Sequence, residues 1–162
     1  MEEKLNTLPW YRLDGTKLEN PLFDTLLSDI SKIDDSIKFY IGADSQYAYK
    51  KTVYSVVLVM LKEGKGGRGY YHRIITKRNE TTKQRLFQET YYAVKLAVEI
   101  NPLLESIGKQ IAEIHTDLNP DPNYISSTMI SQCLGYISGM GFIGRTKPDS
   151  WAASSVADLK SR

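Results

Sequence analysis

Apolar and polar residues follow two different periods along this chain, and those periods predict its elements. Apolar or β-branched runs bounded by glycine or polar residues are typical of strands, and they occupy residues 37–46, 52–61, 70–77, 111–117 and 142–146. Between these runs, apolar residues recur at the three- and four-residue spacing of amphipathic helices, over residues 21–33, 82–107, 124–137 and 149–159. Asn101-Pro102 is a candidate break in the second helix.

The order of these elements predicts the fold class. A short turn and a glycine-rich turn join the first three strands, which favours an antiparallel meander. Each of the last two strands follows a helix, so we expect both to be parallel and reached by right-handed crossovers. We therefore predict an α/β fold with a five-stranded mixed sheet flanked by helices, together with an extra N-terminal helix. At 162 residues the chain fits one domain, with an N-terminal extension and helix over 1–36 and a core over 37–162.

Composition narrows the function classes only slightly. Lys plus Arg is 21 and Asp plus Glu is 19, so a net charge of +2 allows a polyanionic partner without requiring one. Cys133 is the single cysteine, which excludes an intrachain disulfide and a cysteine metal site. The first residues lack the apolar segment of a signal peptide, and no stretch reaches membrane-spanning length. We therefore expect a cytoplasmic protein with no membrane partner.

Carboxylates recur at the ends of predicted strands. Asp44 follows the first apolar strand and Asp117 follows the fourth, and if these strands pair, the two side chains emerge on one face. Asp44 is either a turn initiator or a metal ligand, and Gly42 leaves room beside it for an ion. Glu89 borders the apolar stripe of the long helix, where it either reaches past the sheet edge or is solvated. His115 we interpret as a hydrogen-bonded structural residue.

The acids therefore lie, in order, after the first strand, on the first long helix, after the fourth strand and on the last helix. This arrangement resembles the ribonuclease H-like fold, whose acidic residues occupy the same elements. More closely, residues 41–46 (IGADSQ) and 147–158 (KPDSWAASSVAD) are similar to the ends of a bacterial family of predicted ribonuclease H-like nucleases, long catalogued as a domain of unknown function. The resemblance spans roughly the first strand to the C-terminus, and the N-terminal helix is plausibly included.

The resemblance implies a metal-dependent nuclease that uses two Mg²⁺ or Mn²⁺ ions, which prefer oxygen ligands. Asp44 would bridge both ions, Asp117 would hold one together with the last-helix acid, and Glu89 would hold the other. The fourth acid is Asp149 or Asp158. We favour Asp149 because it borders the apolar face of the last helix at its start. The alternative role of Asp149 is an N-cap of this helix. In the broader fold the last acid lies further into the helix, which favours Asp158.

The implied partner is nucleic acid, with RNA and DNA equally open. Basic residues that could contact phosphates gather around the third strand, the start of the long helix and the last turn: Arg73, Lys77, Arg78, Lys83, Arg85 and Lys147. The alternative is a solvated edge strand that uses Lys and Arg against aggregation. Two function classes remain, a nuclease and a non-catalytic nucleic-acid-binding or scaffold protein of the same fold. A homodimer acting on branched DNA is a sub-case of the first.

Overall fold

The computed structural model describes residues 3–32, 36–62, 64, 66–157 and 160. Its strands form one mixed sheet in the order β1-β4-β3-β2-β5-β6. The strands are β1 (Tyr11–Arg12), β2 (Ile37–Ala48), β3 (Lys51–Lys62), β4 (Gly66–Lys77), β5 (Ile111–His115) and β6 (Gly144–Arg145). The helices are α1 (Leu22–Ile30), α2 (Thr82–Glu105) and α3 (Ile130–Gly139), with short turns η1 (Leu5–Thr7) and η2 (Ile125–Met129) and a π-helix, η3 (Ala152–Ala157).

The predicted topology is confirmed in its main features. Strands β2, β3 and β4 form the antiparallel meander, β5 pairs with β2 in parallel, and β6 pairs with β5 in parallel. The sheet has six strands instead of the expected five because the N-terminal extension adds β1 to the edge of β4, pairing Tyr11 with Tyr71. The expected break at Pro102 is wrong, because this proline lies in the last turn of α2, where few backbone bonds depend on it.

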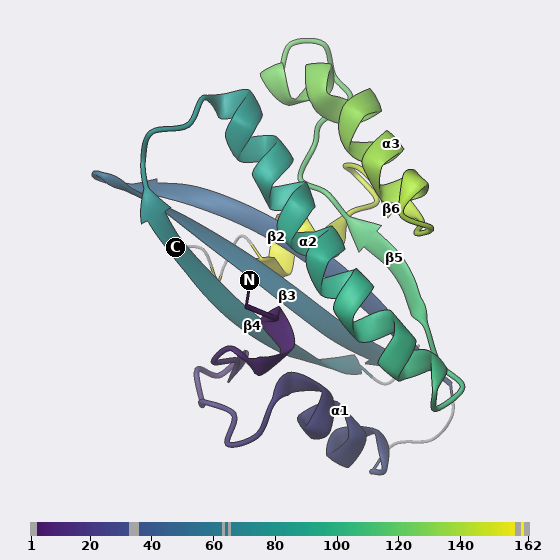
Figure 1. Cartoon of the computed structure of the whole chain (residues 1–162). Coiled ribbons are helices and arrows are strands. Elements are labelled where there is room, and N and C mark those ends of the chain that lie inside the picture. Colours follow the sequence, from purple (N-terminus) through teal and green to yellow (C-terminus); the bar gives the residue numbers. More distant parts are fainter. Residues whose placement is uncertain (1–2, 33–35, 63, 65, 158–159, 161–162) are drawn as a thin grey trace.

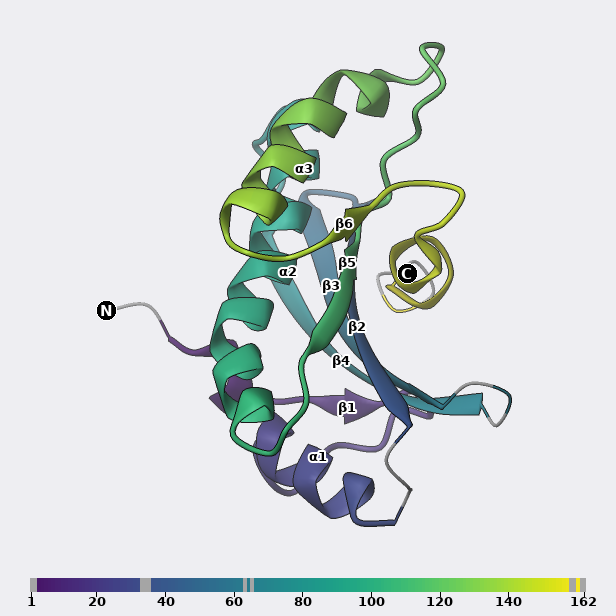
Figure 2. The same cartoon turned by 90° about the vertical axis from the view of Figure 1, so that its right-hand side faces the viewer.

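Helices cover the sheet on both faces. Figure 2 shows the sheet edge-on, with α2 and α3 on one side and the C-terminal helical segment on the other. The main core forms beneath α2, where Phe39 and Ile41 of β2 are buried in one cluster with Ala93 and Ala97 of the helix. Thr81 begins α2 with a capping box, accepting a hydrogen bond from the Gln84 backbone N–H, as the predicted start requires. Figure 1 shows α2 crossing the sheet diagonally.

The opposite face of β2 lies against η3. A Cβ atom added to Gly42 would approach the backbone of Ala152 and Ala153 to 2.6–2.8 Å, which is closer than packed atoms tolerate. Gly42 thus sets how close η3 comes to the sheet. None of the helices formed by the described residues combines the length and the apolar character that a bilayer crossing needs.

This contact generates a stability prediction. We expect Gly42→Ala to destabilise the protein by about 1–3 kcal/mol, because the methyl group meets backbone that cannot rotate away. Gly135→Ala is the matched control: it lies in α3, its added Cβ meets nothing within 4 Å, and alanine favours helix. Urea unfolding of both variants measures the difference. Equal midpoints would show that η3 does not hold this distance from β2 in solution.

Candidate active site

Asp44 lies on β2, and Asp117 comes two residues after the end of the neighbouring parallel strand β5, so the strands pair as the repeated strand-and-acid pattern predicts. The paired register of β2 and β5 ends at Gly42 and His115, and each aspartate comes two residues later in its own segment. The expectation that β2 stops at Asp44 is wrong: the strand continues to Ala48 because β3 pairs with it along its whole length, Asp44 opposite Ser55. Asp44 is therefore an interior strand residue, 4% exposed, and not a turn initiator.

The sheet separates Asp44 from Glu89. Because side chains alternate along a strand, Asp44 shares the face of Gly42, toward η3, whereas Ser45 shares the face of Ala43, toward α2. On that second face the Ser45 hydroxyl donates a hydrogen bond of 2.5 Å to Glu89 Oε1. Glu89 therefore does not extend into solvent. It is 4% exposed and approaches β2 from α2.

Burial makes the Glu89 carboxylate costly to ionise. Burial, reinforced by the negative charge of Asp117, raises the pKa of Glu89 from 4.5 to about 8, although the Ser45 hydrogen bond and the positive charges of Arg85 and Lys147 oppose the shift. The influence of Asp117 on this pKa means that the two carboxylates share one electrostatic environment. A strongly shifted acid beside a second acid is typical of a functional site.

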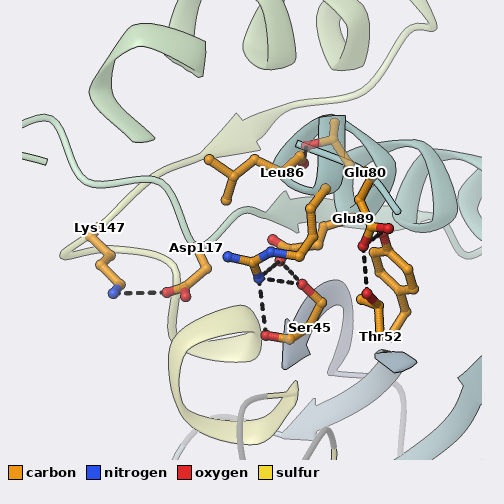
Figure 3. A network of polar contacts seen from close by, with 10 residues as sticks. Ser45, Thr52, Glu80, Leu86, Glu89, Asp117 and Lys147 are labelled. Carbon is orange, nitrogen blue, oxygen red and sulfur yellow. Dashed lines mark hydrogen bonds and ion pairs between the residues drawn. The ribbon is translucent and has the colours of Figure 1, made fainter. Parts of the chain in front are cut away.

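Two cationic side chains hold these acids in the structure, as Figure 3 shows for Asp117 and Lys147. Lys147 Nζ lies 2.9 Å from Asp117 Oδ1, an ion pair in which this buried oxygen accepts no well-directed hydrogen bond. Arg85 Nη1 donates to Ser45 Oγ at 2.6 Å and lies 3.4 Å from Glu89 Oε1. Each of the two acids thus has a cationic side chain beside it.

The remaining predicted acids lie elsewhere. Asp149 is exposed in the loop that leads into η3 and is not a helix N-cap. Glu113, together with the negative charge of Asp149, raises the pKa of Arg145. No contact joins Asp149 to Glu89 or Asp117 among the interactions of the described residues. Asp158, the alternative fourth acid, lies outside the described residues.

His115 positions η3, a role that the sequence pattern only partly anticipates. Its Nδ1 accepts a hydrogen bond of 3.1 Å from the Ala152 N–H, and its Nε2 lies 3.1 Å from Glu113 Oε1. Burial lowers the pKa of His115 despite Glu113, so the neutral ring accepts at Nδ1 and donates to Glu113. Arg145 completes the group with a 2.6 Å bond to Glu113. The expectation that His115 is a hydrogen-bonded structural residue is confirmed.

The predicted basic residues divide between several parts of the surface. Arg78 and Arg85 both lie over the ring of Tyr47, at 3.6 and 4.7 Å, close to Ser45 and Glu89. Arg73 donates to the Lys160 carbonyl on the η3 face of β4. Lys77 and Lys83 line a cavity beside α2, and Lys147 pairs with Asp117. The basic run is therefore not one continuous strip.

The donor set fits a hard divalent cation by chemistry. Its side chains are carboxylates and a hydroxyl, and Asp117 Oδ1 has only an ion pair that a metal ion would compete for. The side chains are nevertheless not gathered for coordination, because across the described ranges no three His, Cys, Asp or Glu residues are placed to hold a metal ion. An ion would therefore need Arg85 and Lys147 to move away.

The raised pKa of Glu89 predicts a pH-dependent stability. Folded Glu89 keeps its proton from about pH 4.5 to about 8, whereas the unfolded carboxyl loses it above about 4.5, so metal-free stability falls as pH rises through this window. Glu89→Gln cannot ionise and keeps an oxygen for Ser45. We expect its stability to match the native protein near pH 5 and to exceed it by about 1 kcal/mol or more at pH 8.

Urea unfolding in a chelator, repeated between pH 5 and 8, measures this difference. Glu105→Gln is the control, because Glu105 is exposed near the end of the same helix and Gln keeps an acceptor for the Asn101 amide. A Glu89→Gln effect that stays constant across this pH range would contradict the assignment.

Comparisons with known proteins agree with the fold. The sequence model of a family described as Ribonuclease H-like matches residues 22–162. No curated protein and no solved structure gives a significant match. The match covers all strands from β2 to β6 and the elements that carry Glu89 and Asp117. On this ground, and on a mixed sheet of the expected topology, the chain belongs to the ribonuclease H-like family.

Proposed function

We propose that this protein is a metal-dependent nuclease that hydrolyses phosphodiester bonds of nucleic acid. The observation that carries the proposal is the buried, electrostatically coupled pair Glu89 and Asp117 beside the β2–β5 junction, where Asp44 also lies. Burial that raises the pKa of Glu89 to about 8, beside a second acid, supports a functional role for this carboxyl group. Bound cations would offset the cost of placing these carboxylates together.

The ligands that we propose are Asp44, Glu89, Asp117 and Asp149, with Asp158 as the alternative to Asp149. Two bound Mg²⁺ or Mn²⁺ ions would lower the pKa of the attacking water and stabilise the leaving oxygen. Asp44 lies on the η3 face of β2 and Glu89 on the α2 face, so a shared ion would require one of these two side chains to reach past the sheet. Asp149 would have to turn from the loop before η3 toward Asp117.

Arg85 and Lys147 have a definite role in this proposal. In the metal-free protein they lie beside Glu89 and Asp117, and their positive charges lower the cost of keeping two acids close together. Bound cations would compete with both side chains for the carboxylates and would free them. The freed side chains could hold phosphate oxygens, for which guanidinium and ammonium groups are well suited. Arg78, stacked with Arg85 over Tyr47, extends the same positive edge.

One observation favours the alternative of a non-catalytic nucleic-acid-binding protein. Each of the two coupled acids is already paired with a cation, and the described residues form no three-ligand group. A scaffold that has no use for metal would be stabilised by the same pairs. Metal uptake therefore separates the two functions.

Asp44→Asn tests the nuclease proposal. The change keeps size and removes the charge that would bridge two ions, so we expect Mg²⁺- or Mn²⁺-dependent cleavage to fall at least about 100-fold while the fold persists. Cleavage of single-stranded, duplex, hybrid and branched substrates with each metal, beside calorimetric titration with Mn²⁺, measures the effect. Asp121→Asn is the control, since it makes the same change at an exposed loop position after β5.

Cleavage by Asp44→Asn at the native rate would remove Asp44 from the catalytic group. A native protein that binds nucleic acid, cuts none of these substrates and takes up no Mn²⁺ would establish the scaffold function instead.

Proposed nucleic-acid contacts give a second test. We expect Arg73→Ala, Lys77→Ala and Arg78→Ala together to weaken binding and to reduce the slope of log affinity against log salt by about 2–3, since each lost phosphate contact contributes about 0.7–0.9 to that slope. The triple control of Lys17→Ala, Lys32→Ala and Lys38→Ala removes the same charge from exposed positions of the N-terminal region and early β2. Equal slopes for both triples would favour the solvated-edge interpretation.

A further inference from the structure

A cavity of about 750 Å³ lies beside the candidate active site on the α2 face of the sheet. The first turns of α2 form one wall, the end of β4 and the loop after it form another, and the η2–α3 segment closes the third side. Figure 1 shows these elements meeting where α2 begins. The volume is within the range of about 300–1,000 Å³ that is typical of small-molecule sites.

The lining of this cavity combines rings, amides and ammonium groups. Phe87 and Tyr92 present aromatic rings, and Lys77 and Lys83 form no ion pair with a described residue. The side-chain amides of Gln88 and Gln132 likewise form no hydrogen bond with a described residue. Free amides offer a donor and an acceptor together, which matches the edge of a nucleobase, and aromatic rings stack on its face.

Glu80, the acidic residue of this lining, already accepts hydrogen bonds from its neighbours. Glu80 accepts a 2.5 Å hydrogen bond from the Thr52 hydroxyl, a 3.3 Å bond from Tyr54 and a backbone bond from Asn79. These bonds hold Glu80 as part of the wall. The groups still available to a ligand are therefore neutral amides, rings and positive charges, and they suit an anionic nucleotide better than a cation or a basic peptide.

The cavity and the acids share one helix. Gln84 and Gln88 are four residues apart on α2 and face the cavity, whereas Arg85 and Glu89 form the adjacent row of the same helix and face the acid site. The negative charge of Glu89 contributes to the raised pKa of Tyr54, which lines the cavity. The two sites therefore lie side by side.

We propose that this cavity binds one base of a single-stranded segment, next to the Arg85–Glu89 pair. The inference rests on the proposed nuclease function and deepens it by naming the substrate class. An unpaired, unstacked base can enter this open cavity, whereas a base inside a duplex is held by pairing and stacking, so the site selects single strands over duplex. Gln88 and Gln132 contact the base edge, Phe87 and Tyr92 contact its face, and Lys77 and Lys83 hold flanking phosphates.

Binding measured without cleavage tests this proposal. Fluorescence anisotropy in a chelator compares short single-stranded DNA and RNA with matched duplexes, for the native protein and for Lys83→Ala/Gln88→Ala. We expect single-strand affinity to fall about tenfold in this variant and duplex affinity to stay within about twofold. The control is Lys109→Ala/Gln110→Ala, which makes the same chemical change at the far end of β2, beside Lys38.

An abasic scan locates the bound base. One missing base along the oligonucleotide should weaken native binding about tenfold, and the same oligonucleotide should cause no further loss in Lys83→Ala/Gln88→Ala. Equal losses on single strands and duplex, an abasic scan without effect, or no binding of single strands by the native protein would each overturn the proposal. Urea midpoints equal to the native value confirm that each variant is folded.

Cleavage assays with Mn²⁺ keep this proposal separate from the nuclease function. A protein that cuts single strands without any effect of the abasic position is a nuclease that lacks this base site. A protein with the position-dependent binding and no cleavage has the base site without the catalytic activity.

Discussion

Strand β2 is covered on both faces, and the rest of the structure depends on how its alternating side chains divide between them. It pairs with β3 along its whole length on one edge and with β5 over residues 39–42 on the other. Toward α2 it presents Ala43 and Ser45, and toward η3 it presents Gly42 and Asp44. A shift of one residue in its register would exchange these sets and would bury the wrong side chains on each face. The side of the sheet on which Asp44 lies, and the bond between Ser45 and Glu89, follow from this register.

The second constraint is charge. Glu89 is buried where its ionised form is disfavoured, and Arg85 reaches it from one helical turn earlier. Lys147 lies in the loop after β6 and pairs with Asp117. The side chains of Arg85 and Lys147 thus supply positive charge where a bound metal ion would supply it. The proposed active site and the stability of the metal-free protein draw on the same four side chains, so each variant of this group changes both.

Local patterns predicted much of the fold because burial imposes a period on the residues that it covers. The strands, the helices and the parallel placement of β5 beside β2 follow from such patterns. Asp44 was misplaced as a strand end, since Asp and Ser usually terminate strands and the pairing partner that extends β2 lies in another segment. The pairs of Asp117 with Lys147 and of Ser45 with Glu89 join residues that are far apart in sequence. No spacing rule encodes such contacts, because they exist only after the sheet has formed.

The N-terminal extension has a consequence for where the folding unit begins. Trp10 is 1% exposed within the main core, and Glu99 of α2 accepts hydrogen bonds from the backbone N–H groups of Leu5 and Asn6. Arg12 of β1 also pairs with the buried Asp29 of α1. A chain trimmed to the start of the family match at residue 22 would therefore lose a core side chain, uncover the outer edge of β4 and leave a buried acid short of a partner. The family match begins at residue 22, whereas the residues that pack into the core begin before it. A recombinant protein should therefore keep the N-terminal extension.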